Sequence, residues 1–427
     1  MTDDLFPDQL TDTLPDIDRA SGLSHLEAFA GKAGHAYAKG RNFDLGPSRH
    51  HLVSCLSAHL RRRLLTEDEV IDAVLARHSF PAAEKFITEV YWRTYFKGWL
   101  EMRPSVWQHW LSDLTRLPHT DAVETACSGQ TGIDCFDFWV DELVRTGYLH
   151  NHARMWFASV WIFTLRLPWQ QGAAFFMKYL RDGDPASNTL GWRWVAGLQT
   201  RGKAYAARAE NIDQFTRGRF APHGRLNEQV FAVDGPENPS AQPLMMPSAS
   251  PFVADGVPYL LVLTAEDCHP ESLALPHAPA ALVSLPSWLG NYQIGADLNW
   301  LRGAQADRLD QAALTDTLAR AQAHFAVPQA ATSALDVERD GQSDHLLDQT
   351  AEQLAELCRQ HQISDLVTAY LPVGFWQSHY QRLCAHPALS GVRSHFVMRD
   401  YDRRAWPSAT KGFFPFKSKI PGWLNQR

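Results

Sequence analysis

DGDPASNTLGWRW, residues 182–194, is the stretch that says most about the fold of this chain. It places Asp182 and Asp184 on either side of a glycine, with Asn188 four residues further on and two tryptophans at its end. Two carboxylates one residue apart also admit a metal site. We do not expect a metal, because no histidine or third acid stands at ligand spacing.

Three earlier segments of the chain have a similar density of polar and aromatic residues. In LVSCLSAHLRRRLL (52–65) serine hydroxyls and free N–H groups at a helix start could hold a pyrophosphate. FITEVYWRTYFKGWLEMRP (86–104) would place an acid, a large ring and a guanidinium on one broad helix face. TGYLHNHARMWFASV (146–160) sets an amide, a guanidinium and a thioether at helical spacing. Taken singly, these segments have ordinary structural explanations: the serines could cap a helix, and the helical segments could be buried helices with an ion pair.

Taken together, the segments resemble the FAD-binding domain of the DNA photolyase/cryptochrome family over about residues 30–200. The strings that carry the resemblance are WRTYFKGWLE (92–101), TGI (131–133), TGYLHNHARM (146–155) and DGDPASNTLGWRW. The resemblance implies a U-shaped FAD among helices, with Arg154 and Asp182 paired beside the isoalloxazine and Asn188 facing flavin N5. The cofactor-binding residues that it implies are Tyr37, Ser54, Leu56, Ser57, Arg93, Asn151, Arg154, Asp182, Asp184 and Asn188.

The same resemblance implies a substrate pocket and an electron-transfer route. The predicted catalytic residues are Glu89, Trp92, Asn151, Met155 and Trp194. Family members that act on (6-4) photoproducts carry histidines at the positions of Asn151 and Met155, so cyclobutane dimers are favoured. Trp192 and Trp169 match the first two electron-transfer tryptophans of the family. The third position falls in 111–132, which has no tryptophan, so we expect Trp107 or Trp110 to substitute or photoreduction to be poor.

The function implied is light-driven repair of cyclobutane pyrimidine dimers in DNA by a deoxyribodipyrimidine photolyase-like lyase. Excited reduced FAD would supply the electron, and UV-damaged DNA would be the partner. The alternative is a cryptochrome-type blue-light photoreceptor that signals through the redox state of its flavin. A flavoprotein with a vestigial light response is a third interpretation.

The pattern of elements changes between the two halves of the chain. Residues 1–226 are expected to form the helical FAD-binding domain, and 227–258, rich in Pro, Ser and Ala, a linker. In 259–427 strand-like and helix-like stretches alternate, which predicts an α/β, Rossmann-like parallel sheet without a G-x-G-x-x-G fingerprint. The fold class is therefore two domains, all-α followed by α/β. The second domain resembles the family's α/β antenna domain, moved to the C-terminus. We therefore expect that it could hold a second, antenna chromophore, whose identity is unknown.

Composition and charge set the remaining expectations. With 45% hydrophobic and 20% charged residues, the chain has the composition of a water-soluble globular protein. Its net charge is −7, yet residues 151–226 contain 11 basic residues against 4 acidic ones. The positive electrostatic potential of such a segment could hold phosphates. The acidic first residues do not look like a signal or transit peptide, and the longest apolar run, 155–165, is too short for a membrane span. The six cysteines show no disulfide or metal spacing. We expect a cytoplasmic monomer.

Overall fold

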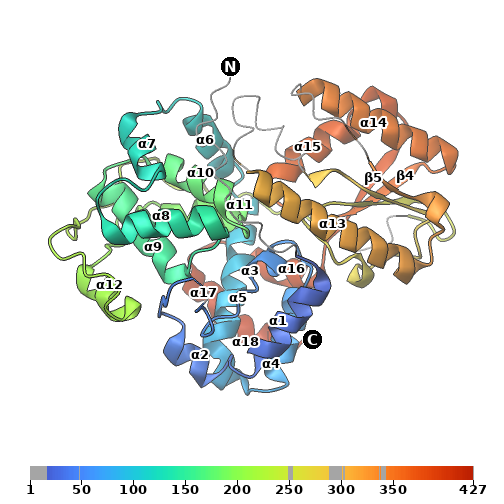
Figure 1. The fold of residues 1–427 in the computed structure, drawn as a ribbon. Helices are drawn as coiled ribbons and strands as arrows, with labels where there is room; N and C mark the ends of the chain where they lie inside the picture. The colour runs from blue at the N-terminus through green and yellow to red at the C-terminus, as the bar shows by residue number, and fades with distance from the viewer. Residues whose placement is uncertain are drawn as a thin grey trace.

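The structure is a computed structural model that describes residues 17–47, 49–248, 253–287, 301, 303–335, 337 and 343–426. Figure 1 shows a helical part, residues 17–226, beside a sheet part, residues 257–399, with the C-terminal segment, residues 400–426, lying against the helical part. None of the helices among these residues has the length and apolar character that a membrane span requires.

The helical part is built from short helices around one long central helix, α5 (Phe80–Glu101). Local signals begin and end several of them. Thr66 and Glu69 form a capping box at the start of α4, and α8 ends at Gly147, whose positive φ suits glycine. The apolar run 155–165 is buried over residues 156–163 and is split between α9 and a π-helical segment, η1 (Val160–Thr164). The helices besides α5 are α1 (Arg19–Ala30), α2 (His35–Gly40), α3 (Ser57–Arg61), α4 (Glu67–Leu75), α6 (Ser105–Leu114), α7 (Asp121–Cys127), α8 (Asp134–Thr146), α9 (Asn151–Ser159), α10 (Trp169–Tyr179), α11 (Pro185–Val195) and α12 (Ala209–Thr216).

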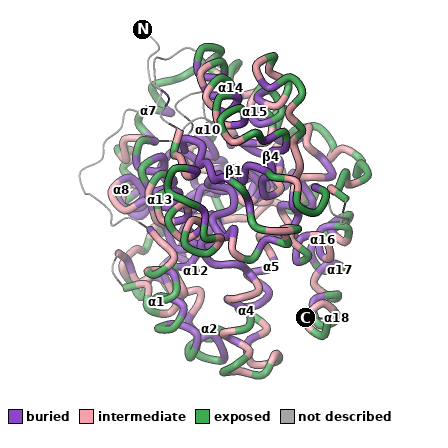
Figure 2. The backbone as a smooth tube through the Cα atoms, turned by 90° about the vertical axis from the view of Figure 1, so that its right-hand side faces the viewer, coloured by how far each residue is buried: buried purple, intermediate pink, exposed green. Residues whose placement is uncertain are grey.

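The sheet part contains a parallel sheet of strand order β3-β2-β1-β4-β5, which confirms the parallel sheet predicted from the alternating pattern. Residues of β1, β2 and β4 are buried, as the continuous apolar runs require, and Figure 2 shows β1 and β4 inside the molecule. The strands are β1 (Leu260–Leu263), β2 (Ala281–Ser284), β3 (Thr332–Ala334), β4 (Asp365–Ala369) and β5 (Arg393–Val397), and the main helices are α13 (Ala304–Phe325), α14 (Ser343–Gln360) and α15 (Phe375–Cys384).

The C-terminal segment leaves the sheet part and packs on α5. It contains α16 (Asp400–Ala405), the 3-10 turn η7 (Trp406–Ser408), α17 (Phe413–Lys417) and α18 (Ile420–Leu424). Tyr401 stacks on Tyr91, and the Tyr95 hydroxyl donates to the carbonyl of Lys411 at 2.8 Å. Although this segment lies within the stretch 259–427 expected to form one domain, its aromatic residues find apolar partners on α5.

The predicted linker, 227–258, has no regular structure where it is described, and it runs along the helical part. Val233 donates its N–H to the Ala196 carbonyl and Gln242 donates to that of Met102. Arg193 and Arg103 hold Asn238 and the carbonyl of Pro239. These hydrogen bonds hold the segment on the surface of the helical part.

Three consecutive buried arginines join the helical part to the other two. Arg61 donates to Glu266 at 2.7 Å, Arg62 pairs with Asp310 at 2.5 Å, and Arg63 pairs with Asp402 at 2.6 Å. A buried charge is tolerated only when it is paired and hydrogen-bonded. The pairs therefore fix how α3 sits against the sheet part and the C-terminal segment.

Gly98 tests the packing of the C-terminal segment. A Cβ added there would lie 2.9 Å from Trp406 Cα, so Gly98→Ala should push η7 off α5 and lower the free energy of unfolding by about 1–3 kcal/mol. Gly422→Ala in α18 is the control, since its Cβ would meet nothing within 4 Å. Urea unfolding of both variants measures the difference. Equal stabilities would contradict the close contact between α5 and η7.

Candidate functional site

A cavity of about 630 Å³ opens inside the helical part, between α2, α3, α5, α9 and α11. It gathers all the predicted cofactor-binding residues, all the predicted catalytic residues and Trp192. These side chains come from segments up to about 150 residues apart in sequence, so only the fold brings them together. Their individual roles stay predictions. Trp169 is buried at the start of α10 and does not line the cavity.

One stripe of α5 supplies the charged wall. Glu89 and Arg93 line the cavity, and Lys97, one turn further, reaches toward it from a buried position. They stand four residues apart and so share one helix face. Glu89 pairs with Arg41 at 2.6 Å, and burial raises the pKa of its carboxyl against the opposing effect of Arg41. Sequence reasoning did not assign Arg41 or Lys97 a role, although the spacing 89, 93, 97 carried the signal for Lys97.

Asp184 is the carboxylate around which these charges converge. It caps α11 by accepting from Ser187 N–H at 2.7 Å, and its Oδ2 lies 3.6 Å from both Arg93 and Lys97. Burial disfavours its charged form, but Lys97, Arg93 and Arg61 outweigh burial and hold the pKa of Asp184 well below its usual range. It is therefore a buried anion at neutral pH.

Asp182 makes the ion pair that the sequence predicted. Arg154 Nη2 lies 3.0 Å from Asp182 Oδ1, and Arg154 Nε donates to the Leu149 carbonyl at 2.9 Å. Burial raises the pKa of Asp182, while Arg154, Ser57 and Arg93 lower it by more, so the net shift is downward. The pair is fixed at the cavity wall in its charged form.

Asn188 faces the cavity with its oxygen available. Its Nδ2 donates to the Ala173 carbonyl at 2.8 Å, which leaves Oδ1 as the free acceptor. Buried Arg93 Nη1, Asp182 Oδ1 and Asp184 Oδ2 have ion-pair neighbours but form no hydrogen bond of good geometry among the described residues. Buried polar atoms are rarely left without hydrogen bonds, so these three atoms and the Asn188 oxygen are ready contacts for a polar ligand.

Two aromatic residues form the outer wall. Trp92 stacks on Phe413 of the C-terminal segment with ring centroids 3.6 Å apart and an interplanar angle of 11°. Trp194 packs against Tyr205 at 5.5 Å. Sequence reasoning missed Phe413 and Tyr205, because both lie outside the region of resemblance and reach the site only through tertiary packing.

The remaining predicted residues lie where the chain approaches α3. Tyr37 is buried on α2, Leu56 precedes α3, and Ser54 and Ser57 flank that turn. The ring contacts of Trp192 within the described residues are with Phe157, Trp161 and Phe176, and Trp169 is not among them.

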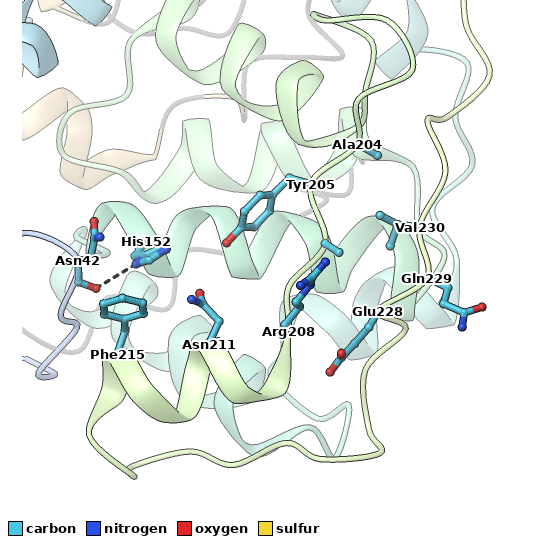
Figure 3. Close-up of a pocket in the computed structure, with 11 residues that line it drawn as sticks. Asn42, His152, Ala204, Tyr205, Arg208, Asn211, Phe215, Glu228, Gln229 and Val230 are labelled. Carbon is cyan, nitrogen blue, oxygen red and sulfur yellow. Dashed lines mark hydrogen bonds between the residues drawn. The ribbon is translucent and has the colours of Figure 1, made fainter.

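A second hollow, which we call the side groove, adjoins the cavity. It encloses about 720 Å³ and is shown in Figure 3. Asn42 and His152 line both hollows. The side groove is lined by Asn42, His152, Ala204, Tyr205, Ala206, Arg208, Asn211, Phe215, Glu228, Gln229 and Val230.

Comparison with known proteins finds similarity between this helical part and a family of FAD-binding domains. Residues 86–226 match the family described as the FAD binding domain of DNA photolyase. The helical part is thus similar to proteins of the photolyase/cryptochrome family. This match confirms FAD as the cofactor predicted for the photolyase/cryptochrome part of the chain, while a second chromophore stays a prediction.

Individual relatives each match a little under half of the chain. The deoxyribodipyrimidine photo-lyase of Streptomyces griseus is 31% identical over 207 residues, 44% of this chain and 44% of that protein. That of Escherichia coli K12 is 27% identical over 212 residues, 47% of this chain and 44% of that protein. The matched segment thus spans less than half of each relative.

Two solved structures are also similar. A bacterial class III photolyase from Agrobacterium tumefaciens is 27% identical, with a TM-score of 0.41 over 46% of this chain and 42% of that one. A Synechocystis cryptochrome is 24% identical, with a TM-score of 0.42 over 50% of this chain and 46% of that one.

Asp184→Asn tests the charge balance of the cavity. Asparagine keeps the helix cap, so the variant removes only the buried charge and leaves Lys97 and Arg93 uncompensated. We expect a loss of about 3–5 kcal/mol in the free energy of unfolding at pH 7. Because the folded-state pKa is lowered, the contribution of Asp184 is present above the unfolded pKa of about 3.9 and is lost as the pH falls below it.

The difference between wild type and Asp184→Asn should therefore shrink in acid, as followed by denaturant unfolding across pH. Asp141→Asn is the control, because Asp141 forms an exposed pair with Arg145 and should cost at most about 1 kcal/mol. A pH-independent difference would contradict the assignment of a buried anion.

Proposed function

We propose that this chain binds FAD in the cavity and repairs cyclobutane pyrimidine dimers in DNA with light. The observation that carries the proposal is that buried polar atoms of Arg93, Asp182 and Asp184, which form ion pairs but no hydrogen bond among the described residues, converge on one cavity with the Asn188 oxygen. A cavity of about 630 Å³ is within the range of roughly 300–1,000 Å³ that cofactor sites occupy. The residues present fit the group.

Each residue would hold one portion of FAD. The pyrophosphate would lie near Arg93 and the turn formed by Ser54, Leu56 and Ser57. At this end of the cavity three cations, Arg93, Lys97 and Arg154, face the two carboxylates Asp182 and Asp184, so the net charge is positive and favours a phosphate. The Asn188 oxygen suits a ring N–H, because its own amide donates elsewhere. When bound and reduced, FAD would supply light-driven electron transfer with no net redox change over the repair cycle.

The outer wall suits a dimer flipped from the duplex. Flipping costs a few kcal/mol, and an aromatic wall returns roughly 1–3 kcal/mol per base. Phe413 covers one face of Trp92 and holds its ring in place, while Trp194, Asn151 and Met155 line the rest of the opening. Glu89 lines the opening beside Arg41, and its carboxyl, once protonated, would hydrogen-bond a pyrimidine carbonyl that gains negative charge.

The sheet part would correspond to the family's α/β domain displaced to the end of the chain. The parallel order β3-β2-β1-β4-β5 supports a Rossmann-like assignment. Arg61 and Arg63 form ion pairs with Glu266 and Asp267, which follow the carboxyl end of β1. We therefore do not propose a site for a second chromophore at that end of the strand. The same proposal includes three boundaries along the chain: a FAD-binding domain at 1–226, a linker at 227–258 and an α/β domain at 259–427. It also includes a monomeric state and a cytoplasmic location.

The photoreceptor alternative is favoured by one observation, the stacking of Trp92 on Phe413. It connects the cavity wall to the C-terminal segment, through which a change at the flavin could reach the surface. Limited proteolysis of the FAD-loaded protein in light and dark tests this. A light-dependent change in cleavage of residues 400–426, without loss of dimers, would decide for photoreception.

Repair is tested by incubating reduced protein with a dimer-containing oligonucleotide under blue light. We expect loss of dimers in light and none in the dark, and Glu89→Ala should lower the repair rate by about tenfold or more, because alanine offers no hydrogen bond to the pyrimidine carbonyl. Glu84→Ala, on the same helix beside Lys417, should repair like wild type. FAD content from the absorption spectrum must be equal in all three. Equal dimer content in light and dark, in protein loaded with FAD, would remove the proposal.

A further inference from the structure

We propose that the side groove binds a nucleotide unit, with a planar base inside it and a phosphate at Arg208. The groove lies directly beside the cavity, since Asn42 and His152 line both and Tyr205 packs on Trp194. The nucleotide is either the neighbour of the lesion in a DNA strand or a free nucleotide. The DNA form rests on the proposed function, whereas the free form does not.

The walls of the side groove are aromatic and held in place. Figure 3 shows Tyr205 over the open space and Phe215 at one end of it. The His152 ring is fixed between Trp156, stacked at 4.5 Å, and Phe215 at 5.1 Å. Aromatic faces are what a base of any sequence stacks on, and about 720 Å³ leaves room for one nucleotide.

Donors and acceptors inside the groove suit the edge of a base. Asn211 Oδ1 accepts from Trp156 Nε1 at 3.0 Å, so the two amide hydrogens of Asn211 point elsewhere, and Figure 3 shows this side chain directed into the groove. His152 donates Nδ1–H to the Asn42 carbonyl at 3.0 Å. Burial lowers the pKa of His152, so its Nε2 stays an acceptor at neutral pH. One donor and one acceptor side by side complement the edges that bases display.

The charge of the groove comes from Arg208. It is exposed, forms none of the ion pairs found among the described residues, and points into the space beneath Tyr205 in Figure 3. Exposed Arg201 and Lys203 precede it on the same loop. The acid of the lining, Glu228, is held by the Ala209 N–H at 2.9 Å. A guanidinium beside an aromatic wall is the arrangement that holds a phosphate next to a stacked base.

The test is the anisotropy of a short undamaged DNA strand carrying a red dye, with 5′-AMP as competitor. Arg208→Ala should weaken binding of the strand about tenfold at low salt and reduce the slope of log affinity against log salt by about 0.7, the value for one phosphate contact to a single strand. Arg116→Ala removes an equally exposed arginine far from the groove and should change neither. Asn211→Asp keeps the acceptor for Trp156, replaces the amide donor by a carboxylate, and should also weaken binding.

The outcomes are separable from those of the repair test. Binding of the strand that 5′-AMP does not displace supports the DNA form, and displacement by 5′-AMP supports a free nucleotide. Binding of neither probe by folded wild-type protein, or equal effects of Arg208→Ala and Arg116→Ala, overturns the proposal. Arg208 and the amide of Asn211 do not line the cavity, so the flavin absorption of these variants should equal that of wild type whether or not the groove binds a nucleotide.

Discussion

Two adjacent arginines hold the loop on which the candidate site depends. Arg61 donates to the Gly183 carbonyl at 3.0 Å and Arg62 donates to that of Arg181 at 2.7 Å. The carboxylates Asp182 and Asp184 sit on this loop between α10 and α11. Both arginines are buried and need acidic partners, which Glu266 and Asp310 of the sheet part provide. The sheet part thereby fixes the backbone that aims the two site carboxylates.

The cavity is consequently a product of charge balance as much as of shape. Asp184 remains an anion because Lys97, Arg93 and Arg61 surround it, and Asp182 remains one because Arg154 faces it. Each of these cations comes from a different turn or helix. A site of this kind is preorganised, since the groups that would meet a charged cofactor are already held in place by their partners.

The order of the elements along the chain does not follow their packing. The C-terminal segment returns to α5 after the sheet part and stacks Phe413 on Trp92, which lines the cavity. Glu101 at the end of α5 accepts from the Tyr370 hydroxyl at 2.8 Å, beside the end of β4. Through such contacts the long central helix touches the site, the sheet part and the end of the chain, and one continuous core runs through all of them.

The sequence by itself determined the local structure and the chemistry that each segment could supply. Helical periodicity, the apolar runs of the strands and the strings around Arg93, Arg154 and Asp182 depend on neighbours in sequence, and these predictions agree with the observed elements and with the lining of the cavity. Only the tertiary structure decided which contacts form between distant segments. These contacts are the pairing of Arg61, Arg62 and Arg63 with acids more than 200 residues away, the stacking of Phe413 on Trp92, and the lining of the side groove beside the cavity. The reason is physical. A buried charge or an aromatic face needs a partner, but nothing in the local pattern says which of many similar residues will supply it once the chain is compact.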